Sequence, residues 1–313
     1  MGMAGKLAAR VKGLSEAEFQ AAFGTEAQCR AVLERLRWPK GFLCPACGHA
    51  GRAWLGERRL YQCNRCKHQV SLTAGTIFHA TKLPLTTWFL AIHLIVTAKN
   101  GISSVELGRR LGVKQTTAWL MKQKIMQVMQ AREAKRPLRG RVEMDDAYLG
   151  GERSGGKRGR GAAGKTPFVA AVETTPERKP RRLRLTVVQG FRKREVARLA
   201  KRDLAAGSNV ISDGLHCWTA VEQAGCQHFP MRTGSGRQAA KWAPFKWVNT
   251  MLGNIKAAIT GTYRRLSPAH APRYLASFAW RFNRRFQLDT MMPRFLHSAA
   301  RTQPLPYRML VTG

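Results

Sequence analysis

Four cysteines of the sequence stand in two C-x2-C pairs, Cys44 with Cys47 and Cys63 with Cys66. Each C-x2-C turn directs two thiolates at one metal ion, and two such turns complete a tetrahedral site that leaves no place for water. Gly48, directly after the first pair, suits the tight turn that this arrangement needs. We therefore predict a structural zinc ion (Zn2+) bound by all four cysteines, with four free buried cysteines as the alternative.

Two aspartates form a second candidate metal site. The segment 141–150 (RVEMDDAYLG) alternates like a β-strand and has Asp145 and Asp146 at its centre, although acidic residues are depleted in strands. Asp213 ends a short apolar strand and precedes a glycine, so it is either a simple turn residue or a side chain that projects from the edge of a sheet. Taken together, Asp145 and Asp213 have the form of a two-carboxylate site for Mg2+ or Mn2+, ions that support phosphoryl transfer.

A third oxygen ligand for such a site is expected from a later helix, and the segment 247–259 (WVNTMLGNIKAAI) is predicted to be that helix. The segment contains no carboxylate, and Asn249 and Asn254 carry its only side-chain amides. Asn249 and Lys256 are seven residues apart, which is two helical turns and places both residues on one face.

These motifs together resemble the bacterial insertion-sequence transposases of the IS1595 group, over about residues 35–285. The resemblance also includes the AGTIFH segment after the cysteine pairs, the GTY sequence after the later helix, and WRFNRR near the end of the matching region. It implies an RNase H-like catalytic domain with a triad of Asp, Asp and Glu, or Asn in some members, followed seven residues later by Lys. The resemblance thus assigns catalysis to Asp145, Asp213, Asn249 and Lys256, with Mg2+ or Mn2+ bound by the first three. Asn254 is the second choice for the third position.

The charge of the chain indicates a polyanionic partner. The sequence has 54 Lys and Arg against 18 Asp and Glu, a formal net charge of +36. An excess of this size is typical of proteins that bind nucleic acid; a ribosome-like or membrane-surface protein is the alternative. Two basic clusters are predicted to contact DNA phosphates: Lys157-Arg158-Gly159-Arg160, in a glycine-rich loop, and Lys179-Pro180-Arg181-Arg182.

A helix-turn-helix pattern precedes the first aspartate strand. Residues 103–111 have helical periodicity, Gly112 supplies a turn, and a second helix can begin at about Thr116. Residues at the start of a second helix face base edges and phosphates in this motif. We therefore predict that four residues contact DNA: Lys114, Gln115, Thr116 and Thr117. An ordinary helical hairpin is the alternative.

The predicted architecture is α/β, with an N-terminal zinc ribbon and helix-turn-helix-like helices followed by an RNase H-like mixed-sheet catalytic domain. The expected parts are a helical lead (1–40), the zinc ribbon (41–80), the helix-turn-helix-like segment (81–136), the catalytic domain (141–290) and a tail (291–313). No targeting segment is visible, and the longest apolar run, 88–98, is well short of the roughly 18 residues that a membrane span needs. We expect a bacterial cytoplasmic, nucleoid-associated protein without a membrane partner.

The expected function is that of a DNA transposase that cleaves transposon ends and joins them to target DNA by two-metal-ion phosphoryl transfer. Its partners are double-stranded DNA, both the terminal inverted repeats and the target, and a second copy of the chain in a homodimer or larger assembly. One alternative is a DNA-binding regulator whose catalytic site has decayed, with Asn249 as the sign of decay. Another is a nuclease that cuts without joining.

Overall fold

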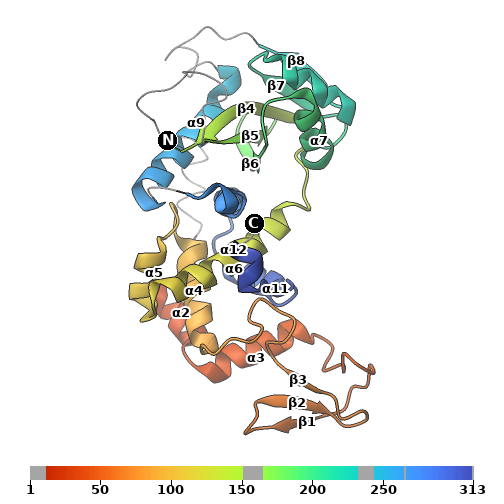
Figure 1. Ribbon diagram of the computed structural model, residues 1–313, viewed down its shortest axis with the longest axis vertical. Coiled ribbons are helices and arrows are strands. Elements are labelled where there is room, and N and C mark those ends of the chain that lie inside the picture. The colour runs from red at the N-terminus through yellow and green to blue at the C-terminus, as the bar shows by residue number, and fades with distance from the viewer. Residues whose placement is uncertain (1–11, 151–164, 232–242, 264–265, 312–313) are drawn as a thin grey trace. The chain divides into compact units, whose positions relative to one another are not determined.

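The computed structural model in Figure 1 describes residues 12–150, 165–231, 243–263 and 266–311. Its residues form two compact units. The first unit contains residues 12–98, 104–128 and 286–311, and the second contains the described residues of 99–103 and 129–285. The predicted phosphate contacts Lys157, Arg158 and Arg160 lie outside the described residues.

The helices of the first unit are defined by local capping and by a shared apolar core. The predicted helical lead is two helices, α2 (Glu16–Phe23) and α3 (Glu26–Arg37), because Ser15 and Thr25 each start a helix with a capping box. Helix α4 (Leu85–Thr97) packs against α3, and α11 (Met291–Ala299) packs against both of them. A short helix, α12 (Tyr307–Val311), follows.

A small antiparallel sheet lies between α3 and α4 in the sequence. Its strands are β1 (Arg52–Leu55), β2 (Leu60–Cys63) and β3 (Gln69–Ser71), in the order β1-β2-β3. The first C-x2-C pair precedes β1, and the second begins at the last residue of β2. The sheet therefore brings the two pairs together, as the prediction of a zinc ribbon requires.

The predicted pair of helices after α4 is confirmed. Helix α5 (Ser104–Leu111) and helix α6 (Gln115–Glu133) are joined by residues 112–114. Gly112 has a φ of +64°, a left-handed conformation that suits glycine, and the N–H of Val113 donates to the carbonyl of Gly108 at 3.0 Å. The turn is thus as tight as the sequence pattern predicts.

The second unit contains a mixed five-stranded sheet in the order β6-β5-β4-β7-β8. Strands β4, β5 and β6 are antiparallel neighbours, whereas β7 is parallel to β4 and β8 is parallel to β7. The strands are β4 (Arg141–Leu149), β5 (Thr166–Thr174), β6 (Pro180–Val187), β7 (Asn209–Ser212) and β8 (Gln227–Pro230). The predicted mixed-sheet α/β domain is confirmed.

Helices cover both faces of this sheet (Figure 1). Helices α9 (Lys246–Ala258) and α10 (Ala271–Phe282) pack on one face, where Ala147 and Leu149 of β4 belong to the core. Helix α7 (Lys193–Asp203) and the 3-10 helix η1 (His216–Ala224) pack on the other, with Val142 and Met144. The short helical turns of this unit are η2 (Ala243–Phe245), η3 (Ile259–Tyr263) and η4 (Pro268–His270).

Among the residues that the structure describes, the helices are all too short or too polar to cross a membrane.

Candidate functional site

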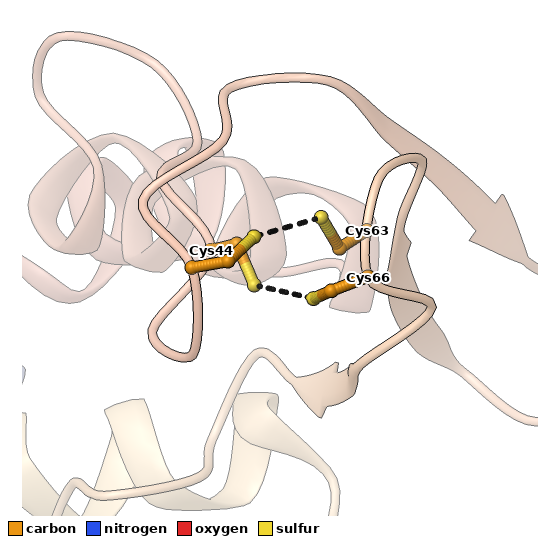
Figure 2. Close-up of side chains that lie close together, drawn as sticks. Cys44, Cys63 and Cys66 are labelled. Atoms are coloured by element: carbon orange, nitrogen blue, oxygen red, sulfur yellow. Dashed lines mark hydrogen bonds between the residues drawn. The ribbon is translucent and has the colours of Figure 1, made fainter.

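The four cysteines of the two C-x2-C pairs meet at one point. Cys44 Sγ lies 3.6 Å from Cys66 Sγ, and Cys47 Sγ lies 3.6 Å from Cys63 Sγ. Figure 2 labels Cys44, Cys63 and Cys66 of this cluster. All four sulfur atoms lie within 4.8 Å of one another. A Zn–S bond of about 2.3 Å gives a tetrahedral edge of about 3.8 Å, whereas a disulfide bond is only about 2.05 Å long. The cluster therefore has the size of a tetrahedral zinc site, and its cysteines form no disulfides.

The two C-x2-C turns have the same backbone hydrogen bonds. In the first, the N–H of Gly48 donates to the carbonyl of Cys44 at 2.8 Å; in the second, Lys67 donates to Cys63 at 3.1 Å. Gly48 and Lys67 both have positive φ, +72° and +60°. Lys67 thus takes the place of the glycine that the sequence analysis noticed only in the first turn.

Two thiols of the cluster differ in pKa. The pKa of the Cys63 thiol is lowered to about 6, chiefly by a hydrogen bond from the backbone N–H of Cys66. The backbone N–H of His68 lowers the pKa of the Cys66 thiol, but hydrogen bonding with the neighbouring thiols raises that pKa to about 12. The thiolate is the form of cysteine that binds metal. Four thiolates on two rigid turns make a closed, structural type of zinc site.

Three carboxylates form a second cluster, in the second unit. Asp145, Asp146 and Asp213 each offer an oxygen, and these oxygens lie within 4.8 Å of one another. All three residues are half-buried. Strands β4 and β7 are in parallel register with Glu143 opposite Ile211, so that Asp213 follows β7 at the level of Asp145. The topology therefore brings together the two aspartates that the sequence analysis selected.

Asp146 is the member of this cluster that the sequence analysis did not select. Neighbouring residues of a strand point to opposite faces, so only one of two adjacent acids is expected at a site on a sheet. Strand β4, however, continues six residues beyond Glu143, the last residue that pairs with β7. Beyond the last residue that pairs with β7, both carboxylates of β4 can reach Asp213. The signal in the sequence was the occurrence of two adjacent acids in the centre of a strand.

The carboxylate of Asp213 is fixed by two hydrogen bonds. Its Oδ1 accepts the backbone N–H of Leu215 at 3.1 Å and the indole N–H of Trp218 at 2.9 Å. The hydrogen bond from Leu215 is that of an Asx turn. Asp213 is therefore a turn residue as well as a member of the carboxylate cluster. Trp218 is fully buried in the core beneath η1 and therefore holds the carboxylate in one orientation.

Glu143 connects the strand of Asp145 to α9. Its carboxylate is buried, and Oε2 accepts the backbone N–H groups of Trp247 at 2.9 Å and Val248 at 3.1 Å, in the first turn of α9. Oε1 accepts from the guanidinium of Arg141 at 2.7 Å. A carboxylate at a helix N-terminus satisfies open N–H groups and interacts favourably with the helix dipole. Glu143 thus fixes the start of α9 two residues from Asp145 on the same strand.

The predicted third ligand lies in this first part of α9. Asn249 is half-buried, whereas Asn254 and Lys256 are exposed. Val248, Leu252 and Ile255 are buried against the sheet, and the helical period places Asn249 and Lys256 on one side of this buried face and Asn254 on the other. The burial favours Asn249 over Asn254, and its role as a ligand and that of Lys256 stay predictions.

The residues predicted to contact DNA lie at the start of α6. Lys114, Gln115 and Thr116 are exposed, and Thr117 is half-buried. The side-chain N–H of Gln115 donates to Ser104 Oγ at 2.8 Å, which connects α6 to α5. Gln115 therefore supports the helix pair in addition to its predicted contact with DNA.

In the second basic cluster predicted to contact phosphates, residues 179–182, one arginine is hydrogen-bonded within the protein. Arg182 donates to the carbonyls of Pro137 at 3.2 Å and Arg136 at 3.0 Å, and burial lowers its pKa. Arg181 and Lys179 are exposed. The cluster therefore offers fewer free cations to DNA than the sequence analysis expects.

Comparison with known proteins matches both units. The family model for an ISXO2-like transposase domain matches residues 137–283, and that for a transposase zinc-ribbon domain matches residues 24–69. The chain is also 29% identical over 175 residues to an uncharacterised protein in transposable element ISH50 of Halobacterium salinarum. This alignment covers 50% of the chain and 58% of the relative, so the chain spans less than two thirds of that protein.

Proposed function

We propose that the chain, which matches the family models for an ISXO2-like transposase domain and a transposase zinc-ribbon domain, cuts the ends of a transposable DNA element and joins them to target DNA. The observation that carries the proposal is the cluster of three carboxylates beyond the end of β7, within the residues that match the transposase domain. Hard oxygen ligands of this kind suit Mg2+ or Mn2+.

The residues of the cluster have distinct tasks in this proposal. Asp145, Asp146 and Asp213 hold the divalent ions, and Trp218 keeps Asp213 oriented for this purpose. Two such ions, when bound, activate the attacking oxygen and stabilise the leaving oxygen of a phosphodiester. Asn249 adds a neutral oxygen ligand from α9, and Glu143 holds that helix in place.

The exposed Lys256, on the same side of α9 as Asn249, holds a phosphate of the DNA near the site. The attacking groups are water in the cutting step and the freed 3′-hydroxyl in the joining step. The zinc ribbon and the start of α6 recognise the terminal inverted repeats. Pairing of two ends requires a dimer or larger assembly, and the reaction takes place on bacterial DNA in the cytoplasm.

The test is strand transfer of labelled element ends into a plasmid, with Mg2+ or Mn2+. We expect the unaltered protein to cut and join, and the variants Asp145→Asn and Asp213→Asn to bind the ends without doing either. Cutting that is never followed by joining indicates a plain nuclease.

A DNA-binding regulator is the second candidate, and the absence of a carboxylate from the described helix α9 favours it. Asp146 weakens this candidate, because it gives the cluster a third carboxylate from β4. If the protein binds the element ends but cuts them with neither Mg2+ nor Mn2+, it is a regulator rather than an enzyme.

A further inference from the structure

Helix α7 has an exposed face made only of cations. Between residues 192 and 202 six residues are exposed, and every one is basic. They are Arg192, Lys193, Arg194, Arg198, Lys201 and Arg202. The opposite face of α7 packs Val196, Leu199 and Ala200 into the core beneath the sheet.

The spacing of these residues produces a continuous stripe. Arg194, Arg198 and Lys201 follow one another at intervals of four and three residues, so they lie on one side of the helix. From Arg194 to Arg202 the stripe is about 12 Å long. One strand of DNA carries a phosphate about every 3.4 Å of helix axis, so that the stripe matches a run of three to four phosphates.

The acidic residues of α7 neutralise only part of this stripe. Glu195 and Asp203 are buried, and they form ion pairs with Arg198 at 3.2 Å and Arg202 at 2.8 Å. The side chains of Arg194, Arg198 and Arg202 nevertheless stay 75%, 65% and 55% exposed. The stripe therefore remains a cationic surface that a partner can reach.

The stripe begins near the carboxylate cluster. Phe191, directly before the stripe, contacts the ring of Tyr148 edge-to-face at a centroid distance of 5.4 Å. Tyr148 is two residues beyond Asp146, and strand alternation places both on the α7 face of the sheet, with Val142 and Met144. A duplex that follows the stripe is thus led toward the carboxylates from the side opposite α9.

The composition of the stripe indicates which DNA it fits. It contains no amide or hydroxyl side chain, whereas the start of α6 offers Lys114, Gln115 and Thr116. Base recognition uses such polar groups in addition to arginine, but phosphate recognition needs only positive charge. A surface of this kind suits a duplex whose sequence is not read. This stripe is a poor surface for contact with a second copy of the chain, whose net charge is also +36.

We propose that the basic stripe of α7 binds the phosphate backbone of the target DNA, independently of its sequence. The proposal rests on the proposed function, because only a joining enzyme needs a second duplex beside the element ends. It assigns capture of the target to the α7 face of the catalytic unit.

The experiment compares two triple variants of the full chain with the unaltered protein. The first removes charge (Arg194→Ala, Arg198→Ala, Lys201→Ala), and the second keeps it (Arg194→Lys, Arg198→Lys, Lys201→Arg). We expect the first to cut element ends within about twofold of normal but to join them to a plasmid at least about tenfold less, and the second to behave normally. Binding to a random-sequence duplex without element ends is measured at several salt concentrations. In the first variant only, the slope of the logarithm of the binding constant against the logarithm of the salt concentration should become smaller in magnitude by about two to three.

Equal loss of cutting and joining overturns the proposal and assigns the stripe to the element ends. Unchanged joining with unchanged salt dependence overturns it as well. If the unaltered protein neither cuts nor joins, the proposed function fails, and the salt dependence of random-duplex binding still decides whether the stripe holds DNA. The single variant Lys201→Ala, which removes no ion pair of the described residues, should change both readouts in the same direction by a smaller amount.

Discussion

The two candidate metal clusters of this protein have similar dimensions and opposite construction. In both, the ligand atoms lie within 4.8 Å of one another. The cysteines stand on two short turns with the same local hydrogen bonds, and four thiolates fill a tetrahedral site. The carboxylates come from β4 and from the turn after β7, and within the described part of the chain no strand pairs with β4 beside them on the β7 side. The first arrangement closes around its ion, whereas the second, under the proposed function, has to admit a DNA substrate as well.

Loss of zinc should have the largest effect. Binding of structural zinc contributes on the order of 10–16 kcal/mol in zinc-finger peptides, so Cys44→Ser should abolish zinc binding and unfold the ribbon. Elemental analysis of the purified protein should give one zinc per chain, and thiol titration should find the four cysteines protected until a chelator is added. Cys226→Ala, which changes a buried cysteine outside the cluster, is the control and should keep its zinc. Freely reactive thiols in the folded, zinc-free protein would contradict the assignment.

Asp145→Asn and Asp213→Asn should each decrease cutting at least about a thousandfold, because each removes both a ligand and a charge from the ions. The contrast with the cysteines lies in folding: both variants should unfold near the normal temperature and bind DNA with nearly normal affinity. Nicking assays and thermal unfolding of the same preparations check the two parts. An active Asp145→Asn variant would remove the carboxylate cluster from the proposed mechanism.

The third position should give a graded result. Asn249→Ala loses an oxygen ligand but no charge, and we expect activity to fall by about ten- to a hundredfold. Asn249→Glu restores the commoner arrangement of the transposases that the chain resembles. This variant should retain activity and should reach half-maximal activity at a lower metal concentration. Asn254→Ala is the matched control on the other side of α9, and it should decrease activity only slightly. If Asn249→Ala is normally active and Asn254→Ala is inactive, Asn254 rather than Asn249 is the third ligand.

Glu143→Gln tests how strongly α9 depends on its carboxylate cap. A glutamine oxygen can still accept from the two N–H groups, but the amide NH2 then faces the Arg141 guanidinium in place of Oε1, and the negative charge at the helix N-terminus is lost. We therefore expect a loss of about 1–3 kcal/mol in the free energy of unfolding. If Glu143 positions Asn249, the metal concentration for half-maximal nicking should rise as well. Glu195→Gln, at a buried carboxylate on the other face of the sheet, should change stability without changing that concentration.

Asp146→Asn should have the smallest effect of these carboxylate variants, because Asp145 and Asp213 remain. We expect the metal concentration for half-maximal activity to rise by about tenfold, with a nearly normal rate at saturating metal. A metal titration of nicking measures both quantities. Complete loss of activity at every metal concentration would make Asp146 an essential ligand rather than an auxiliary one.

The part of each site that could be predicted from the sequence follows from the range of the interactions that build it. The cysteine turns are local, and their spacing alone predicted the four residues that the structure brings together. Asp145 and Asp213 were selected because a strand and a turn are also local patterns. Asp146 was not selected, because the alternation of side chains along a strand argues against two adjacent ligands. Both aspartates of β4 can reach Asp213 because the pairing with β7 ends at Glu143.

Glu143 could not be found from a local pattern. Its partners lie 104 and 105 residues later in the sequence, at the start of α9. Arg182 illustrates the reverse problem: composition suggests a phosphate contact, but the fold uses its guanidinium to bind the carbonyls of Arg136 and Pro137. In a chain with 54 basic residues, charge alone does not distinguish these uses.

The strand order of the five-stranded sheet has a consequence for folding. Strand β4 is first in the sequence but central in the sheet, and β5 and β6 pair beside it as a simple meander. The parallel strand β7 and the contact of α9 with Glu143 close much longer loops, which form more slowly. We expect the meander to form first, when it carries Asp145 and Asp146 without Asp213. If the chain cuts DNA as proposed, this capacity appears only in the last steps of folding, and partly folded chains do not yet cut the DNA that their positive charge attracts.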